Sequence, residues 1–243
     1  MIDRLLRRVR GKKAPASTPR RSFSYEEAVA LLAGRGVDES IITLGSVSEG
    51  SFASVAEAVA RHGPARPLRA LHIGNFLGLS LAALSDIVVR HDSRSVIVSV
   101  DPNLRHHGID DPQSHVMALL DHFGLQGNNV VICAYSMQRV ENRTHVGTFA
   151  DQPAGEHALA NLERLGQRFD IAMVDGNHDA NYVRGELETL ARILDEGALL
   201  VLDDVANDHT QLPALFEEVV ADGSWPFEEA GRDGRLGILR RMA

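Results

Sequence analysis

The chain has 243 residues, of which 44% are hydrophobic and 24% are charged, and its formal net charge is -8 at pH 7. An acidic body repels phosphate, which argues against a general nucleic-acid-binding protein, and no apolar stretch reaches the roughly 20 residues that a membrane-spanning helix needs. The single cysteine, Cys133, excludes an internal disulfide and a cysteine-rich zinc site, and we predict that it is a small buried residue.

The chain begins with a basic segment. Residues 1–21 contain eight bases and one acid, a net charge of +7. Their apolar residues fall near helical spacing, so one interpretation is an amphipathic helix that touches an anionic surface. A solvated, flexible tail is the favoured alternative. The stretch from Gly11 to Pro19 is polar and contains two prolines, unlike the apolar core of a secretory signal, so we expect a cytoplasmic protein.

Residues 22–66 are predicted to form a helical extension. Ser24-Tyr-Glu-Glu27 resembles a capping box, and the helix it starts should stop near Gly34 and Gly36. A second helix is expected from Glu49 to His62, where Gly63-Pro64 ends it. We expect the extension to be a cap over a cleft or a packing surface, and a dimer contact would make the protein a homo-oligomer.

Residues 67–243 alternate between short apolar runs and amphipathic helical stretches. This alternation is typical of an α/β fold, a parallel sheet with helices on both faces. Two short runs around Asp233-Gly234 predict a terminal antiparallel hairpin. The predicted strands are 68–74, 95–101, 129–135, 169–175 and 197–203, the predicted helices are 79–91, 114–123, 156–165, 181–194 and 213–221, and the hairpin runs are 227–230 and 236–240.

The first predicted strand ends in a glycine turn. Gly74 and Gly78 bracket the passage from strand to helix in Leu71-His-Ile-Gly-Asn-Phe-Leu-Gly-Leu-Ser80. Glycine lets the backbone approach a ligand closely, although a tight turn with close packing explains the same residues. Asp101, at the tip of the next strand, can accept hydrogen bonds from both hydroxyls of an adenosine ribose. Its alternative role is to cap the loop before Pro102, and the glycine turn favours ribose binding.

Three aspartates follow two later strands. Asp175 ends the predicted strand 169–175, and Asp203 and Asp204 follow its neighbour. Adjacent strands lie about 5 Å apart, so these carboxylates should converge. Carboxylates so close repel one another unless a cation lies among them, and oxygen ligands suit magnesium or calcium. We therefore predict a divalent metal site. The alternative is that the three residues cap loops and accept backbone N–H groups.

His178 lies three residues after Asp175, on a loop that would face the same cleft. An imidazole can take a proton from a hydroxyl whose acidity a neighbouring metal has raised. A metal ligand and an ordinary loop histidine are the other interpretations, since the chain has 11 histidines.

The order of these motifs resembles the class I S-adenosylmethionine-dependent methyltransferases, over about Leu68 to Val205. The most specific stretch begins Phe169-Asp-Ile-Ala-Met-Val-Asp-Gly-Asn-His and continues to Asp203-Asp204. It is similar to the metal-dependent small-molecule O-methyltransferases (methyltransferase family 24-like). The resemblance implies a Rossmann-like seven-stranded, mostly parallel sheet with an antiparallel last strand, S-adenosylmethionine as methyl donor, and often a bound Mg²⁺. It also implies a small-molecule acceptor, such as a sugar, glycoside, polyketide or catechol-like natural product.

The same resemblance assigns roles to single residues. The implied donor-binding residues are Gly74, Asn75, Gly78, Ser80, Asp101, Ser136 and Asp175. Asp175, Asp203 and Asp204 match the metal-binding acids, and His178 matches the histidine proposed as the catalytic base in some relatives. Two positions depart from the family pattern. His72 replaces an acid, and Ala134-Tyr135-Ser136 replaces a common Gly-Asp-Ser.

Three other functions remain open on the sequence. Gly176-Asn-His-Asp179 also occurs in metallophosphoesterases, but the other metal-binding motifs of that class are not in the required order. A dinucleotide oxidoreductase shares the glycine turn, but Phe76 occupies the place of the second glycine of its fingerprint. A non-catalytic or metal-independent S-adenosylmethionine-binding protein is the third, because His72 and Ala134 depart from the pattern.

Overall fold

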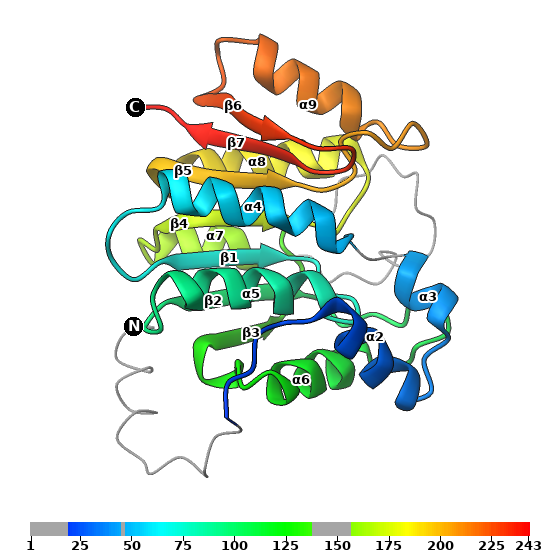
Figure 1. Cartoon of the computed structure of the whole chain (residues 1–243). Helices are drawn as coiled ribbons and strands as arrows, with labels where there is room; N and C mark the ends of the chain where they lie inside the picture. Colours follow the sequence, from blue (N-terminus) through cyan, green and yellow to red (C-terminus); the bar gives the residue numbers. More distant parts are fainter. Residues whose placement is uncertain (1–18, 45–46, 138–156) are drawn as a thin grey trace.

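The computed structural model describes residues 19–44, 47–137 and 157–243. Within these residues, seven strands form one sheet (Figure 1). The strands are β1 (Arg69–Ile73), β2 (Val96–Asp101), β3 (Asn129–Cys133), β4 (Phe169–Val174), β5 (Leu194–Leu202), β6 (Phe227–Arg232) and β7 (Gly237–Arg241). The helices are α2 (Tyr25–Gly34), α3 (Glu39–Leu44), α4 (Glu49–His62), α5 (Leu79–His91), α6 (Pro112–His122), α7 (Ala158–Arg164), α8 (Ala180–Ile193) and α9 (Leu212–Ala221), with a short 3-10 turn at Gln126–Asn128.

The strand order is β3-β2-β1-β4-β5-β7-β6. Neighbours from β3 through β5 are parallel, and β7 is antiparallel to both β5 and β6. The predicted seven-stranded, mostly parallel sheet with an antiparallel last strand is therefore confirmed.

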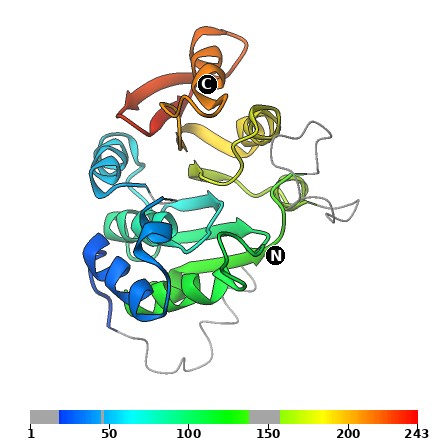
Figure 2. The same cartoon turned by 90° about the vertical axis from the view of Figure 1, so that its right-hand side faces the viewer.

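Helices cover both faces of the sheet (Figures 1 and 2). The helices α4, α5 and α6 pack on one face, and α7, α8 and α9 pack on the other. Each central strand supplies alternate side chains to the two cores, because successive residues of a strand point to opposite faces. In β4, Ile171 and Met173 belong to the first core, and Ala172 and Val174 belong to the second.

Of the N-terminal extension, α2 and α3 lie toward the end to which the parallel strands point, whereas α4 runs along one face of the sheet (Figure 1). Ser24 caps α2, since its hydroxyl oxygen accepts a hydrogen bond from the Glu27 N–H at 3.3 Å. The helix α2 contacts α3 and α6, and α3 was not predicted. Residues 1–18 of the basic segment lie outside the described residues, so its predicted contact with an anionic surface stays a prediction.

The terminal hairpin forms across Asp233-Gly234, as predicted. Because β7 runs opposite to β5, Gly237 at the start of β7 pairs with Leu202 at the end of β5. A Cβ at Gly237 would lie 2.2 Å from the Phe216 ring of α9, so glycine is required here. The hairpin turn consequently lies at the carboxyl edge of the parallel strands.

Two further expectations concern the single cysteine and membrane-spanning helices. Cys133 is exposed at the end of the edge strand β3, so the prediction that it is buried is wrong. Among the described helices, none combines the length and the hydrophobicity of a membrane span.

Candidate active site

The strand order reverses between β1 and β4, which makes the gap beyond their carboxyl ends the expected ligand site of an open sheet. Backbone hydrogen bonds hold the tips together. Asp175 N donates to Ile73 O at 2.8 Å, and Asp203 N donates to Val174 O at 3.0 Å. The residues that follow β1, β4 and β5 therefore meet at one edge.

The two glycines of the turn after β1 are required by the packing of the protein itself. Gly74 has φ +88°, and a Cβ there would lie 2.3 Å from the Asp175 carbonyl oxygen. Gly78 has φ +93° and precedes α5, where a Cβ would lie 3.0 Å from Val116 Cα. Close packing thus accounts for both glycines, and their contact with a donor stays a prediction.

Asp101 caps the loops around it. Its Oδ2 accepts hydrogen bonds from Asn75 N at 2.7 Å and Phe76 N at 3.3 Å, and its Oδ1 accepts one from Asn103 N at 2.6 Å. A carboxylate offers about four acceptor positions, so these three contacts leave about one for a ribose hydroxyl. The capping role is present in the structure, and the ribose role stays a prediction.

His72 replaces the acid of the family pattern and is fully buried. Its Nδ1 lies 3.2 Å from Asn75 Oδ1, and its Nε2 lies 3.1 Å from Ser80 Oγ. Burial lowers the pKa of His72 to about 4. The neutral imidazole donates from one nitrogen and accepts at the other, which suits these two partners. The side chains of Asn75 and Ser80 consequently point into the protein interior.

Asp175 and Asp203 meet, as the parallel tips predict. The Asp203 carboxylate and the Ser80 hydroxyl both lie close enough to influence the pKa of Asp175. Burial, together with the negative charge of Asp203, raises the pKa of Asp175 well above its ordinary range. Two carboxyl groups this close repel each other when both are ionised.

A residue that the sequence analysis missed, Arg235, supplies the countercharge. Its Nε donates to Asp203 Oδ1 at 2.6 Å, and its Nη2 donates to Asp203 Oδ2 at 2.5 Å. The same Nη2 lies 3.6 Å from Asp204 Oδ1. The predicted hairpin was the only available signal, because Arg235 lies 32 residues after Asp203.

His178 pairs with Asp204 at the rim of a pocket. Its Nε2 lies 3.0 Å from Asp204 Oδ2, and this hydrogen bond is the main cause that lowers the pKa of Asp204. Asn207 Nδ2 also donates to Asp204 Oδ2, at 3.2 Å. Asp175, Asn177, His178 and Asp203 give the pocket its polar part. Its apolar part comes from β4, β5, α8, α9 and the loop after β5, through Val174, Val183, Leu202, Val205, Leu212 and Leu215.

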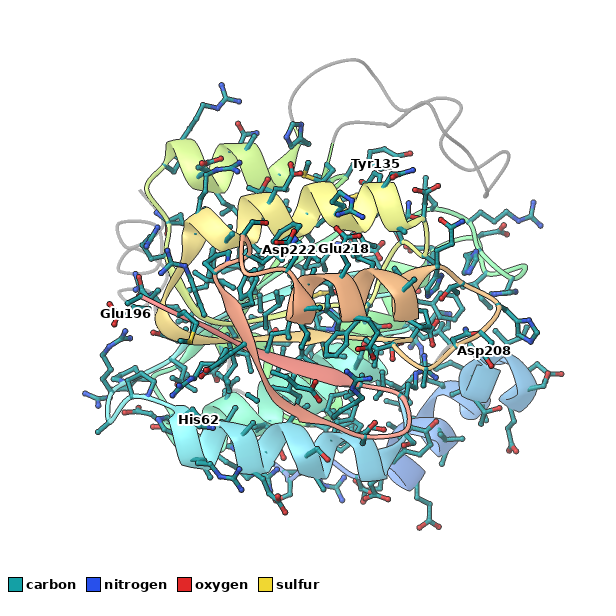
Figure 3. The ribbon with its side chains drawn as sticks, turned by 90° about the horizontal axis from the view of Figure 1, so that it is seen from above. His62, Tyr135, Glu196, Asp208, Glu218 and Asp222 are labelled. Atoms are coloured by element: carbon teal, nitrogen blue, oxygen red, sulfur yellow. The ribbon has the colours of Figure 1, made fainter. Side chains whose placement is uncertain are left out.

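The helices α8 and α9 lie side by side on this face of the sheet (Figure 3). Arg184 of α8 forms an ion pair with Glu218 of α9, which Figure 3 labels. This pair joins the outer surfaces of the two helices, which supply part of the apolar wall of the pocket.

Ser136 makes its contacts inside the protein. Its hydroxyl is hydrogen-bonded to the buried carboxyl of Glu186 and to the Tyr182 hydroxyl, the latter at 3.1 Å. Burial raises the pKa of Glu186 to about 8. Glu186 is not expected in the interior from the sequence, because an acid on an amphipathic helix usually faces solvent. The predicted contact of Ser136 with the donor stays a prediction.

The predicted magnesium site is not formed in the part of the chain that the structure describes. No group of three or more His, Cys, Asp or Glu side chains among those residues has a metal-binding arrangement. Both oxygens of Asp203 are bonded to Arg235, and Asp204 is bonded to His178. The three aspartates therefore do not fit a divalent ion. The assignment of Asp175, Asp203 and Asp204 as metal ligands stays a prediction, which this arrangement does not support.

Comparison with known proteins places the chain in a family. A family model described as a methyltransferase domain, methyltransferase family 24, matches residues 71–205, more than half of the chain. No curated protein matches the chain. Similar solved structures include the O-methyltransferase TomG from Streptomyces achromogenes, in complex with S-adenosylmethionine, with 16% identity over 90% of this chain and 89% of that chain and a TM-score of 0.59.

Two further structures share the fold. The O-methyltransferase from Bacillus cereus, in complex with S-adenosylhomocysteine, is 14% identical over 100% of both chains, with a TM-score of 0.60. CalS11, a TDP-rhamnose 3′-O-methyltransferase of calicheamicin biosynthesis, is 16% identical over 98% of this chain and 92% of that chain, with a TM-score of 0.54. Together with the matched family model, the fold and the order of its motifs show that the chain is a class I S-adenosylmethionine-dependent methyltransferase of the family 24-like branch.

Proposed function

We propose that this methyltransferase transfers a methyl group to a hydroxyl oxygen of a small molecule, with His178 as the base that takes the hydroxyl proton. The observation that carries the proposal is the position of His178 at the pocket rim, with its Nε2 3.0 Å from Asp204 Oδ2. A carboxylate partner orients an imidazole and stabilises the charge that it gains with a proton. The named structures of similar fold are O-methyltransferases, which supports an oxygen acceptor.

The methyl donor is proposed to lie over the turn between β1 and α5. This place is the switch point of the sheet, and the first turn of α5 carries no acid and no side-chain cap. Helix N–H groups at such an end attract a carboxylate, such as that of the methionine part. The remaining acceptor position of Asp101 suits one ribose hydroxyl. S-adenosylmethionine supplies an electrophilic methyl group there.

The acceptor is proposed to bind with its hydroxyl at the pocket beside His178, which as it stands has room for about one water molecule. In-line methyl transfer needs mainly an oxygen that is correctly aimed and deprotonated. His178 can take the proton, and the apolar wall from α8 and α9 excludes water from the reacting oxygen. The apolar wall suits an acceptor with a hydrocarbon or ring portion next to its hydroxyl. A cytoplasmic location stays a prediction.

The test replaces His178 by alanine. Labelled S-adenosylmethionine is first added with the enzyme to an extract of the source organism, and the methylated compound serves as the assay substrate. The turnover of His178→Ala should fall by about 100- to 10,000-fold, the usual contribution of a general base. Its dissociation constant for S-adenosylmethionine, measured by titration calorimetry, should stay unchanged.

His209→Ala is the matched control, because His209 is an exposed histidine in the loop after β5. It should keep wild-type turnover. Full activity of His178→Ala would reject His178 as the base, and a wild-type protein without affinity for S-adenosylmethionine would reject the proposed donor site.

A further inference from the structure

Arg235 is held in place by the hairpin turn between β6 and β7. Asp233 Oδ1 accepts hydrogen bonds from Arg235 N at 2.7 Å and from Leu236 N at 2.8 Å. On the other side, the carbonyl oxygen of Arg235 accepts a hydrogen bond from Val205 N at 3.0 Å. The backbone of Arg235 is therefore fixed both within the turn and to the loop after β5.

The guanidinium of Arg235 binds Asp203 through two parallel hydrogen bonds. The Asp203 side chain is 2% exposed and the Arg235 side chain is 28% exposed, so water reaches this pair from one side only. A planar guanidinium matches a carboxylate in this two-bond geometry better than any other side-chain cation. Since the same group also lies near Asp204, one arginine faces both neighbouring acids.

The other oxygens of the cluster also have partners. Asp204 Oδ2 receives hydrogen bonds from His178 and Asn207, and Asp204 Oδ1 lies 3.6 Å from Arg235 Nη2. Magnesium needs a near-octahedral set of oxygen ligands, and calcium needs at least as many. A divalent ion at this place would have to remove Arg235 from both oxygens of Asp203.

We infer that Arg235 takes the place that a divalent metal would hold among these aspartates, and that methyl transfer proceeds without a bound metal. The part about transfer rests on the proposed function, whereas the part about metal binding does not. Arg235 is a positioning residue, which keeps Asp203 and Asp204 in their places. The proton of the acceptor hydroxyl then goes to His178 with no Lewis acid involved.

The test measures Mn²⁺ binding to the full-length protein by electron paramagnetic resonance, in which bound Mn²⁺ no longer contributes to the free-ion signal. The wild type should leave the free-ion signal unchanged, and Arg235→Gln should lower it, because that substitution releases both oxygens of Asp203. Arg240→Gln is the matched control. Arg240 belongs to the same hairpin but pairs with Glu228, so this variant should behave as the wild type.

Saturable Mn²⁺ binding by the wild type that Asp203→Asn abolishes would overturn the inference. A folded Arg235→Gln variant, by circular dichroism, that binds no Mn²⁺ would overturn it too, since Arg235 would then not be what excludes the metal. If Arg235→Gln does not fold, the inference is tested instead by measuring methyl transfer by the wild type in the presence of the chelator EDTA. Unchanged transfer supports the inference, and a loss that Mg²⁺ restores overturns it.

Titration calorimetry with S-adenosylmethionine, in the same samples, reports on the proposed function alone. A wild type that binds neither Mn²⁺ nor S-adenosylmethionine contradicts the proposed function and leaves the assignment of Arg235 to the metal position intact.

Discussion

At the carboxyl edge of the sheet, the glycine turn and the aspartate cluster each hold a carboxylate, but the hydrogen-bond donors come from different parts of the chain. On the side of the glycine turn, Asp101 accepts three backbone N–H groups from the loops that follow β1 and β2. On the side of the aspartate cluster, Asp203 depends on the side chain of Arg235, which comes from the hairpin at the end of the chain. A carboxylate bound by nearby backbone is a local feature, whereas a carboxylate bound by a distant side chain depends on the whole fold.

Arg235→Ala is the substitution with the largest expected effect on this comparison. It leaves Asp203 buried without a cation, and removal of one partner of a buried ion pair lowers the free energy of unfolding by about 3–5 kcal/mol. Arg240→Ala breaks an exposed pair on the same hairpin and should cost at most about 1 kcal/mol. Urea denaturation of both variants measures the difference, and equal losses would show that Asp203 does not need Arg235.

Gly74→Ala tests the glycine turn after β1, again through the free energy of unfolding. Gly36→Ala is its control, because Gly36 has φ +85° with no atom within 4 Å of an added Cβ, whereas an added Cβ at Gly74 would meet backbone at 2.3 Å. Strained backbone alone costs about 1–2 kcal/mol at either position. The added clash should bring the loss at Gly74 to about 3 kcal/mol. Similar losses in urea denaturation would mean that the turn after β1 yields easily.

His72, which lies beside the glycine turn, makes the free energy of unfolding depend on pH. Its pKa is about 4 in the folded protein against an ordinary value of 6.5, so the unfolded chain binds a proton first as the pH falls. The stability from this group is present above pH 6.5 and is lost toward pH 4, by about 1.4 kcal/mol for each pH unit. His72→Asn should lack this loss. Urea denaturation from pH 7.5 to pH 4.5 measures the free energy of unfolding of both proteins. If the difference between wild type and His72→Asn stays the same across that range, the prediction is wrong.

Elements with local signals were predicted well. The bounds of α5 agree with the sequence-based range, because Gly78 precedes the helix and an apolar pattern fills it. The start of β5 was missed, since Leu194 follows α8 directly without a glycine or proline between them. The short helix α3 was also missed, because six residues give too little periodicity.

In the candidate site, too, the features with local sequence signals are the ones that the sequence predicts. The convergence of Asp175 and Asp203 follows from the order of parallel strands, and a sequence can indicate that order. The partner of Asp203 comes from a hairpin whose register cannot be read from a single sequence. The inward contacts of Ser136 with Glu186 depend on how α8 rotates against the sheet. Three converging acids favour a metal site when only the sequence is known, whereas in the fold Asp203 pairs with an arginine that lies 32 residues away in the chain.

The reversed direction of β7 brings the turn between β6 and β7 to the carboxyl edge of the parallel strands. The connections after β1, β2 and β4 lead through the helices α5, α6 and α8, but the turn at Asp233-Gly234 joins only two antiparallel strands. Exchanging Arg235 of this turn for a neutral residue would change the electrostatic character of the cleft, with the loss of stability expected for Arg235→Ala. The charge beside the proposed acceptor site therefore depends on a residue of the C-terminal hairpin.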